Sequence, residues 1–233
     1  MKKTSLLICL LLTSFLAFNQ KIVEKTIGIK GQKNVTFDFD FADEIKITGW
    51  DKNEISVKAT VNINDNEDNA SFKMEAEELS NSIHFISDIE KINEISKNRV
   101  TIHESRDGKR SVSYHDGWCT DININFEIFV PKNMKIDVKT INGDVTLTNV
   151  TDELNIETIS GLIDLAIQTG AKASIKTSTI TGSVYSNHDI QLNNYDRDKK
   201  YRMVIGRSPD FDLNGGGRSI DLKTISGDIY IRK

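Results

Sequence analysis

The amino-acid sequence predicts an all-β fold whose C-terminal half is a single-stranded β-solenoid, similar to a β-helix. Three observations predict it. Apolar and polar residues alternate over many short stretches, and a period of two is the side-chain period of a strand. The tetrapeptide Thr-Ile-x-Gly occurs four times after residue 139. The chain is rich in Ile, Val, Thr, Asn and Asp and has only two prolines, a composition that suits short strands joined by polar turns.

The repeat is the most informative feature of the chain. Its copies are Thr140–Gly143, Thr158–Gly161, Thr179–Gly182 and Thr224–Gly227. Successive glycines are 18, 21 and 45 residues apart, and alternation leads into and out of each copy. Glycine adopts positive φ without a Cβ penalty, so each copy predicts a turn between two strands. We therefore interpret Gly143, Gly161, Gly182 and Gly227 as structural turn glycines.

Two architectures compete for this pattern. In an antiparallel meander each x-Gly pair would be a two-residue hairpin turn. In a β-solenoid each copy is a corner of one coil, and equivalent corners stack about 4.8 Å apart. We favour the solenoid, because a meander does not require the same tetrapeptide to recur every 18–21 residues. Stacked Thr and Asn side chains would then bond along the ladder, and stacked Ile side chains would fill the interior.

The 45-residue interval before the last copy predicts a loop insertion near residues 193–217. Asn193–Tyr201 is polar and highly charged, Met203–Ile205 could form one strand, and Asn214–Gly217 would bend the chain into the final coil. The solenoid repeats are thus expected over residues 131–233.

Residues 21–130 form a less regular β region without the repeat. Alternation predicts strands at Val35–Phe41, Glu44–Thr48, Glu54–Val61, Ser82–Ile86, Val100–His103, Ser111–Tyr114 and Ile122–Val130. Ile89, Ile92 and Ile95 fit a short helix. This region either supplies the first coils of the same solenoid or forms a separate small β-sandwich.

Residues 1–20 read as a signal peptide, with Lys2 and Lys3 before the apolar run Leu6–Phe18. An uncleaved anchor is the alternative. The run is shorter than the roughly 20 residues that span a bilayer, so we expect cleavage and export to the periplasm or cell surface. The mature chain would hold 28 basic and 34 acidic side chains, a net charge of −6, which argues against nucleic acid as a partner. It would also have no later transmembrane segment.

The run Val130–Val145 resembles the putative adhesin family of bacterial β-strand-repeat proteins of unknown function. The later Thr-Ile-Ser-Gly copies, Asn214–Gly217, Gly227–Ile231 and Ile47–Asp51 resemble it too. The resemblance implies a right-handed β-solenoid, export, and no catalytic residues to carry over. The leader, which ends near Asn19-Gln20, resembles those of Bacteroidota.

Candidate metal sites are weak. The segment His115–Asp121 gathers His115, Cys119 and two Asp, but a zinc site needs three or four ligands with matched spacing, and no second His/Cys pair is present. Asp144 and Asp228 follow their glycines directly, whereas calcium-binding repeats need Asp in register on every coil. We interpret both as solvated turn carboxylates and expect no cofactor or metal.

Reactive motifs for nucleophilic or phosphate chemistry are also absent from the sequence. Once the leader is removed Cys119 has no internal partner, so we expect an inert, partly buried thiol. A disulfide to another chain is the alternative. A group of aromatics could supply a binding patch, although single aromatics on strands more often pack. This group comprises Trp50, Tyr114, Trp118, Tyr185 and Tyr230.

A repeated strand pattern without a cluster of reactive side chains favours a non-enzymatic cell-envelope or surface protein. Such a protein would be an adhesin or structural module that presents a repetitive β face to a protein or glycan. The alternative is a β-helix polysaccharide lyase or hydrolase, which would need carboxylates, or a carboxylate beside Arg or Lys, in a groove.

Overall fold

Strands are the main secondary structure of the computed structural model, which describes residues 20–95, 100–104, 110–114, 120–192 and 209–233. The strands are β1 Lys21–Gly28, β2 Asn34–Phe39, β3 Glu44–Trp50, β4 Glu54–Ile63, β5 Phe72–Glu78, β6 Ser82–Ile89, β7 Val100–Glu104, β8 Arg110–Tyr114, β9 Ile122–Pro131, β10 Lys135–Asn142, β11 Asp144–Thr148, β12 Leu154–Ser160, β13 Ile163–Ala166, β14 Ala173–Ser178, β15 Val184–Ser186, β16 Gln191–Leu192, β17 Phe211–Leu213, β18 Arg218–Ser226 and β19 Ile229–Arg232. The predicted all-β class is therefore correct.

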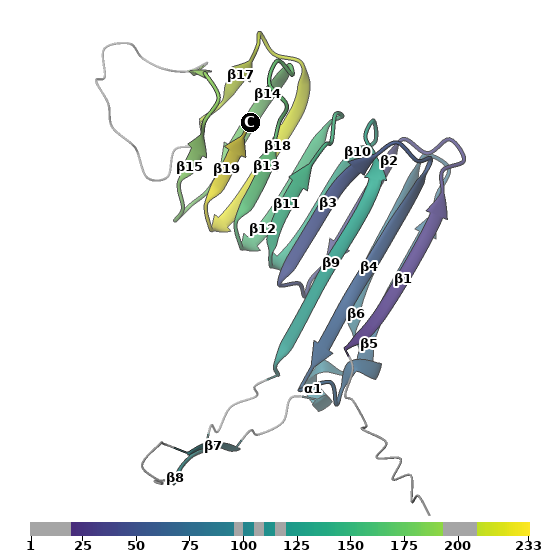
Figure 1. The fold of residues 1–233 in the computed structure, drawn as a ribbon, viewed down its shortest axis with the longest axis vertical. Helices are drawn as coiled ribbons and strands as arrows, with labels where there is room; N and C mark the ends of the chain where they lie inside the picture. Colours follow the sequence, from purple (N-terminus) through teal and green to yellow (C-terminus); the bar gives the residue numbers. More distant parts are fainter. Residues whose placement is uncertain (1–19, 96–99, 105–109, 115–119, 193–208) are drawn as a thin grey trace, which may run out of the picture.

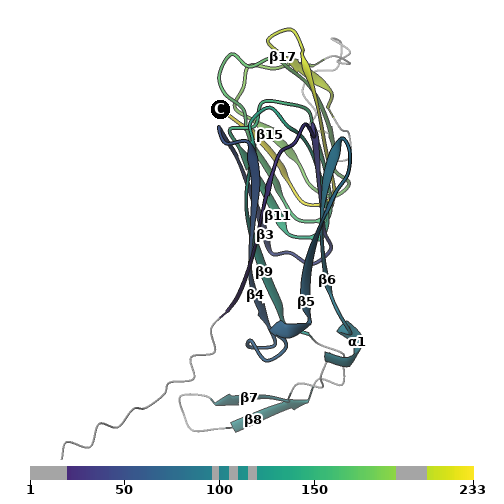
Figure 2. The same cartoon turned by 90° about the vertical axis from the view of Figure 1, so that its right-hand side faces the viewer.

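Most strands belong to two sheets that face each other (Figure 2). The eight-stranded sheet has the order β1-β4-β9-β3-β11-β13-β19-β15, and the nine-stranded sheet has the order β16-β17-β14-β18-β12-β10-β2-β6-β5. Pairing is parallel through most of both sheets. It is antiparallel where β1, β4 and β5 complete the N-terminal end and where β16 and β17 complete the other. The hairpin of β7 and β8 forms a separate two-stranded sheet.

The chain alternates between the sheets in its C-terminal half (Figure 1). Strands β10, β12, β14 and β18 lie in the nine-stranded sheet, and each is followed by a strand of the eight-stranded sheet: β11, β13, β15 or β19. Each Thr-Ile-x-Gly copy lies at one of these four crossings. Parallel strands need such crossings, because a tight hairpin can connect only antiparallel neighbours.

The four crossings lie side by side, but their spatial order differs from their sequence order. Strand β18 pairs with β12 on one side and with β14 on the other. The fourth copy of the repeat therefore lies between the second and the third. Gly161 accordingly has Gly143 and Gly227 as its neighbours, and not Gly182, which is the next copy along the chain.

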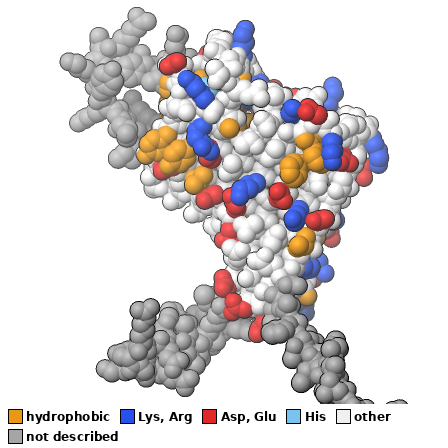
Figure 3. Space-filling view, in the orientation of Figure 1, with side chains coloured by type: hydrophobic (Ala, Val, Ile, Leu, Met, Phe, Trp, Pro, Cys, Tyr) orange, Lys and Arg blue, Asp and Glu red, His pale blue; other side chains and the backbone are white. Residues whose placement is uncertain are grey.

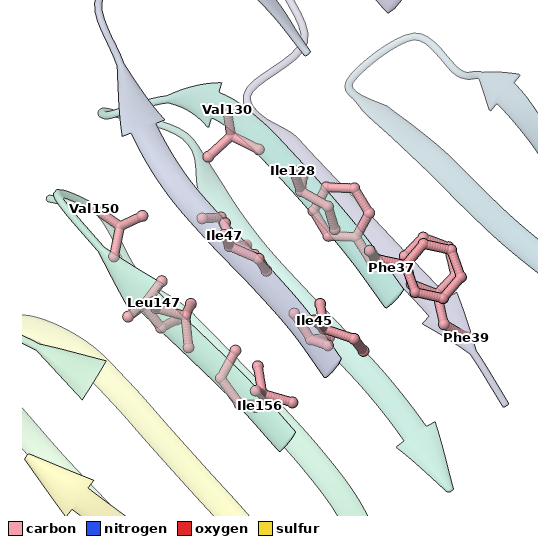
Figure 4. Packing of buried hydrophobic residues seen from close by; sticks show 14 of the residues in the cluster. Phe37, Phe39, Ile45, Ile47, Ile128, Val130, Leu147, Val150 and Ile156 are labelled. Carbon is pink, nitrogen blue, oxygen red and sulfur yellow. The ribbon is translucent and has the colours of Figure 1, made fainter. Parts of the chain in front are cut away.

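The interior holds one continuous apolar cluster to which both halves of the chain contribute. Figure 4 shows Phe37 and Phe39 of β2 among residues from β3, β9 and β11. Phe39 stacks on Phe126 of β9 with a centroid distance of 4.0 Å, which joins the two sheets directly. Because β2 pairs with β10 and β3 pairs with β11, the N-terminal half continues the same two layers.

The predicted strands of the N-terminal half are all present, and β1 and β5 are additions. The predicted helix is a single turn, α1 Ile92–Ile95, and a 3-10 turn, η1, covers Asn69–Ser71. No helix in the described part of the chain is long and apolar enough to cross a membrane. The turn at Asn214 to Gly216 has positive φ at all three residues and leads β17 into β18, as predicted. Asn193–Tyr201 and Met203–Ile205 lie outside the described residues.

Candidate interaction surface

An exposed row of isoleucines follows the crossings between the sheets. It contains the second residue of every repeat copy: Ile141, Ile159, Ile225 and Ile180, in spatial order. Between 40% and 61% of the surface of each side chain is exposed. We call this row the isoleucine ridge. Figure 3 shows hydrophobic side chains gathered at the left-hand edge, where Figure 1 places the turns that follow β12 and β18.

The ridge reverses our expectation that these isoleucines fill the interior. Side chains alternate along a strand, so only one of the adjacent Thr and Ile can point inward. The motif threonines are at most 6% exposed, and the isoleucines therefore point out. Alternation from Ile136 and Val138 through Thr140 already contained this answer, since Ile141 is out of phase with all three.

Threonine is the better interior residue at this position because its hydroxyl reaches a turn carbonyl. Thr224 Oγ1 donates to the Gly161 carbonyl at 3.2 Å, and Thr179 Oγ1 donates to the Gly227 carbonyl at 2.9 Å. Each bond ties one crossing to the crossing beside it. A buried hydroxyl without a partner is destabilising, whereas a bonded one is tolerated. Thr158 Oγ1 is the exception, since it has no partner among the described residues.

The glycines let the crossings approach one another. A Cβ on Gly161 would lie 2.1 Å from the Gly143 carbonyl oxygen, and one on Gly227 would lie 2.0 Å from the Gly161 oxygen. A Cβ on Gly182 would lie 1.7 Å from the Gly227 oxygen. Gly143, at the start of the series, has φ +117° and lies against Ala42. The four predicted turn glycines are therefore brought together in one stack.

An open groove of about 470 Å³ runs beside the ridge on the outer face of the nine-stranded sheet. Its floor carries a row of alternating charge: Asp38, Lys139, Glu157 and Lys223 lie on β2, β10, β12 and β18, each in register with the next. Lys223 Nζ is 3.3 Å from Glu157 Oε1. An exposed ion pair of this kind contributes little to the free energy of unfolding. The row of charges is therefore a feature of the surface rather than a source of stability.

Asp40 lies next to the ridge at the end nearest strand β2. Asp40 follows Phe39, the last residue of β2, which pairs with Thr140. Asp40 therefore takes the place directly after β2 that Ile141 takes on β10. Desolvation, with the neighbouring charges of Asp38 and Asp88, raises the pKa of Asp40 above its ordinary value of 3.8. At this level of the outer face, the side chain is therefore apolar on β10 and acidic at the end of the neighbouring strand β2.

Asp144 and Asp228 have a structural use that the sequence reading missed. Asp144 Oδ1 accepts a hydrogen bond from the Leu162 backbone N–H at 2.9 Å, and Asp228 Oδ1 accepts one from the Ser183 N–H at 2.8 Å. Each carboxylate thus caps a neighbouring crossing whose own copy has no Asp. Within the described ranges no group of three or more His, Cys, Asp or Glu side chains is placed to hold a metal ion.

The candidate aromatics do not form one patch. Tyr185 and Tyr230 stack with centroids 5.0 Å apart on β15 and β19, whereas Trp50 stacks on Phe129 at 5.1 Å, in the strand pair β3 and β9. Tyr114 ends the separate hairpin of β7 and β8. The segment from His115 to Cys119, Trp118 included, lies outside the described residues.

Comparison with known proteins gives a structural match and no sequence match. No protein-family model and no curated protein matches the chain. A crystal structure of a putative cell adhesion protein from Clostridium sporogenes superposes with a TM-score of 0.56 at 12% identity, over 92% of this chain and 99% of that one. The chain has the fold of that protein. The resemblance to bacterial putative adhesins is thereby confirmed in structure, and at this identity it shows the fold alone.

A second solved structure, a putative adhesin from Bacteroides fragilis, aligns over 92% of this chain and 97% of its own at 13% identity. Its TM-score of 0.23 is too low to carry an argument.

Proposed function

We propose that this protein is a non-enzymatic interaction module of the bacterial cell envelope or surface, and that the isoleucine ridge and its groove are the contact surface. The observation that carries the proposal is the exposure of four large apolar side chains at equivalent positions of neighbouring strands. Single exposed apolar residues are ordinary, but a contiguous row bordered by charges is typical of protein interaction sites.

Two features support a displayed surface rather than a pocket. The groove is open, and the turn backbone beneath the ridge is already hydrogen bonded: Gly161 N donates to Ser226 O at 3.1 Å, and Ile180 N donates to Ile225 O at 3.2 Å. A partner would therefore contact side chains. The structural likeness to a putative cell adhesion protein supports the same class of function.

The finer architecture in this proposal is a right-handed β-solenoid with Thr-Ile-x-Gly corners, in which the last coil is inserted between two earlier ones. The stacked glycines and the in-register parallel ladders β2-β10-β12-β18-β14 support it. Residues 1–20 would be the signal peptide, and the mature chain would reside in the periplasm or at the cell surface, where its partner is an envelope or surface protein or glycan.

The test compares capture from envelope fractions of the native host by immobilised protein. The double variant Ile159→Ser/Ile225→Ser should lose roughly tenfold or more of the captured partner, because it removes the centre of the ridge. Ile22→Ser is the matched control, since Ile22 is also exposed, at 58%, but lies on edge strand β1. Equal capture by wild type and the ridge variant would overturn the proposal.

A polysaccharide lyase or hydrolase is the second candidate, because the groove sets Asp38 and Asp40 near Lys139. An acid with a raised pKa next to a second carboxylate is an arrangement that glycoside hydrolysis can use. Release of new reducing ends or unsaturated sugars from envelope polysaccharide by purified protein, abolished in Asp40→Asn, would favour this candidate over the first.

A further inference from the structure

We propose that the partner of the isoleucine ridge is a second copy of this chain, docked face to face about a twofold axis that lies between β12 and β18 and runs parallel to the strands. The inference deepens the proposed function, since it names the occupant of the same surface. It rests on the way charged and apolar residues are arranged about the centre of that surface.

A twofold axis in this position sets residues at the same level along the strands opposite each other, with the strand order reversed. Strand β12 then faces β18 of the partner subunit, and β10 faces its β14. On the ridge, Ile159 faces Ile225 of the partner subunit. Likewise Ile141 faces Ile180 of the partner subunit. A twofold interface uses one patch twice, so the patch must be complementary to itself.

The charged rows satisfy this requirement. Glu157 and Lys223 occupy paired positions on β12 and β18, so Glu157 faces Lys223 of the partner subunit on both sides of the axis. This arrangement converts one pair within the chain into a set of four alternating charges across the interface. Complementary charge across an interface sets register and excludes other arrangements.

The next outward row on the same four strands follows the same rule. It contains Asp137, Asn155, Asp221 and Lys176, in register from β10 to β14. Asp137 therefore faces Lys176 of the partner subunit, and Asn155 faces Asp221 of the partner subunit, to which an amide can donate. In neither row does the axis set two like charges opposite each other.

The position of the axis is set by the limits of the ridge. A shift of one strand, to an axis between β10 and β12, would place Asp40 opposite Ile225 of the partner subunit. Burying a carboxylate against an apolar side chain without a partner costs several kcal/mol in general, so the centred axis is preferred. The ridge has four isoleucines, and only the centred axis covers all of them.

The four-strand face is small. Four strands spaced about 4.8 Å apart and about seven residues of 3.3 Å give a face of roughly 19 by 23 Å, or about 440 Å², well below the roughly 800 Å² per partner of a stable complex. The dimer should therefore be weak and reversible. Weak contacts of this kind can hold two surfaces together when many copies bind at the same time.

Sedimentation equilibrium of purified wild-type protein from about 1 to 500 μM, a range chosen for a weak interface, should show monomer and dimer in exchange. Asp137→Lys should weaken the dimer roughly tenfold or more, because it replaces two symmetric attractions by two repulsions. Lys176→Glu should do the same for the same reason. These two positions do not pair within one chain, because β12 and β18 separate their strands.

An equimolar mixture of the two single variants is the decisive sample. Lys at position 137 of one subunit then faces Glu at position 176 of the other, and the second pair is that of the wild type. A heterodimer should therefore form with about the wild-type affinity, although each variant alone dimerises roughly tenfold or more weakly. Lys46→Glu, on the opposite sheet, is the control and should dimerise as the wild type does. Thermal melts establish that every variant is folded.

Wild-type protein that stays monomeric over this range would overturn the self-association. Dimerisation of both single variants with the wild-type affinity, or a mixture that dimerises no more strongly than the single variants, would overturn this axis. The ridge-dependent capture from envelopes is a separate measurement, so it distinguishes a wrong partner from a wrong function.

Discussion

At the scale of single residues, the second position of each repeat copy determines which side chain is exposed at the surface. Thr140 and its equivalents point inward, and two of them, Thr179 and Thr224, donate to the neighbouring turn. Ile141 and its equivalents point outward and form the ridge. The glycine at the fourth position permits a carbonyl contact that any side chain would block.

Gly161→Ala tests the stack of turns. The new Cβ would lie 2.1 Å from the Gly143 carbonyl oxygen, so the crossings must separate, and we expect a loss of about 3 kcal/mol of unfolding free energy. Gly28→Ala is the matched control, because a Cβ there meets nothing within 4 Å, and it should change stability by less than about 0.5 kcal/mol. Urea denaturation measures both. Similar small losses would show that the turns are loose.

Asp40 predicts a pH dependence. Its pKa is raised in the folded protein, mainly by desolvation, so the folded state holds the proton more tightly than the unfolded state. Stability should therefore fall as the pH rises above about 3.8 through the folded pKa. Asp40→Asn should be more stable than wild type at pH 7 and equal to it below pH 3.8, by a small amount because Asp40 is exposed. Thermal melts at several pH values check this, and an advantage that grows toward acid pH would contradict it.

At the scale of elements, the order of the strands in the sheets could not be read from the spacing of the repeat copies. Strands β18 and β19 are last in the chain, but they lie between β12 and β14 in one sheet and between β13 and β15 in the other. Each sheet therefore depends on its last strand to hold the third repeat copy in place.

Removal of residues 218–233 tests this order. In a solenoid whose coils stack in sequence, loss of the last coil would leave the third copy packed on the second. In the observed order it removes the parallel neighbour of both β14 and β15. We expect residues 173–186 to lose amide protection, while β10 keeps its pairing with β2 and β12. Hydrogen exchange of the truncated chain measures this, and retained protection in β14 would refute the dependence.

At the scale of the whole molecule, two facing sheets share one core from β1 to the C-terminus. The N-terminal half contributes large side chains such as Phe37, Phe85 and Phe126 to that core. The proposed export belongs to this scale too, because it decides which partners the isoleucine ridge can meet.

The leader predicts a processed protein in the native host. Cleavage after the apolar run should leave a new N-terminus near residues 18–21, immediately before β1 begins at Lys21. Mass analysis of protein isolated from the envelope fraction checks this. An intact Met1 in a cytosolic fraction would contradict export and remove the basis for a surface function.

The sequence by itself determined the all-β class and most of the strands, because alternation reports local backbone geometry directly. It also contained the outward direction of Ile141 and its equivalents, although hydrophobicity alone pointed the other way. Only the tertiary structure decided that β18 is inserted between β12 and β14, since equal repeat copies can stack in more than one order at similar local energy. The ridge as a continuous surface and the row that runs from Asp137 to Lys176 follow from that order, because neighbours across a parallel sheet are set by long-range pairing and not by distance along the chain.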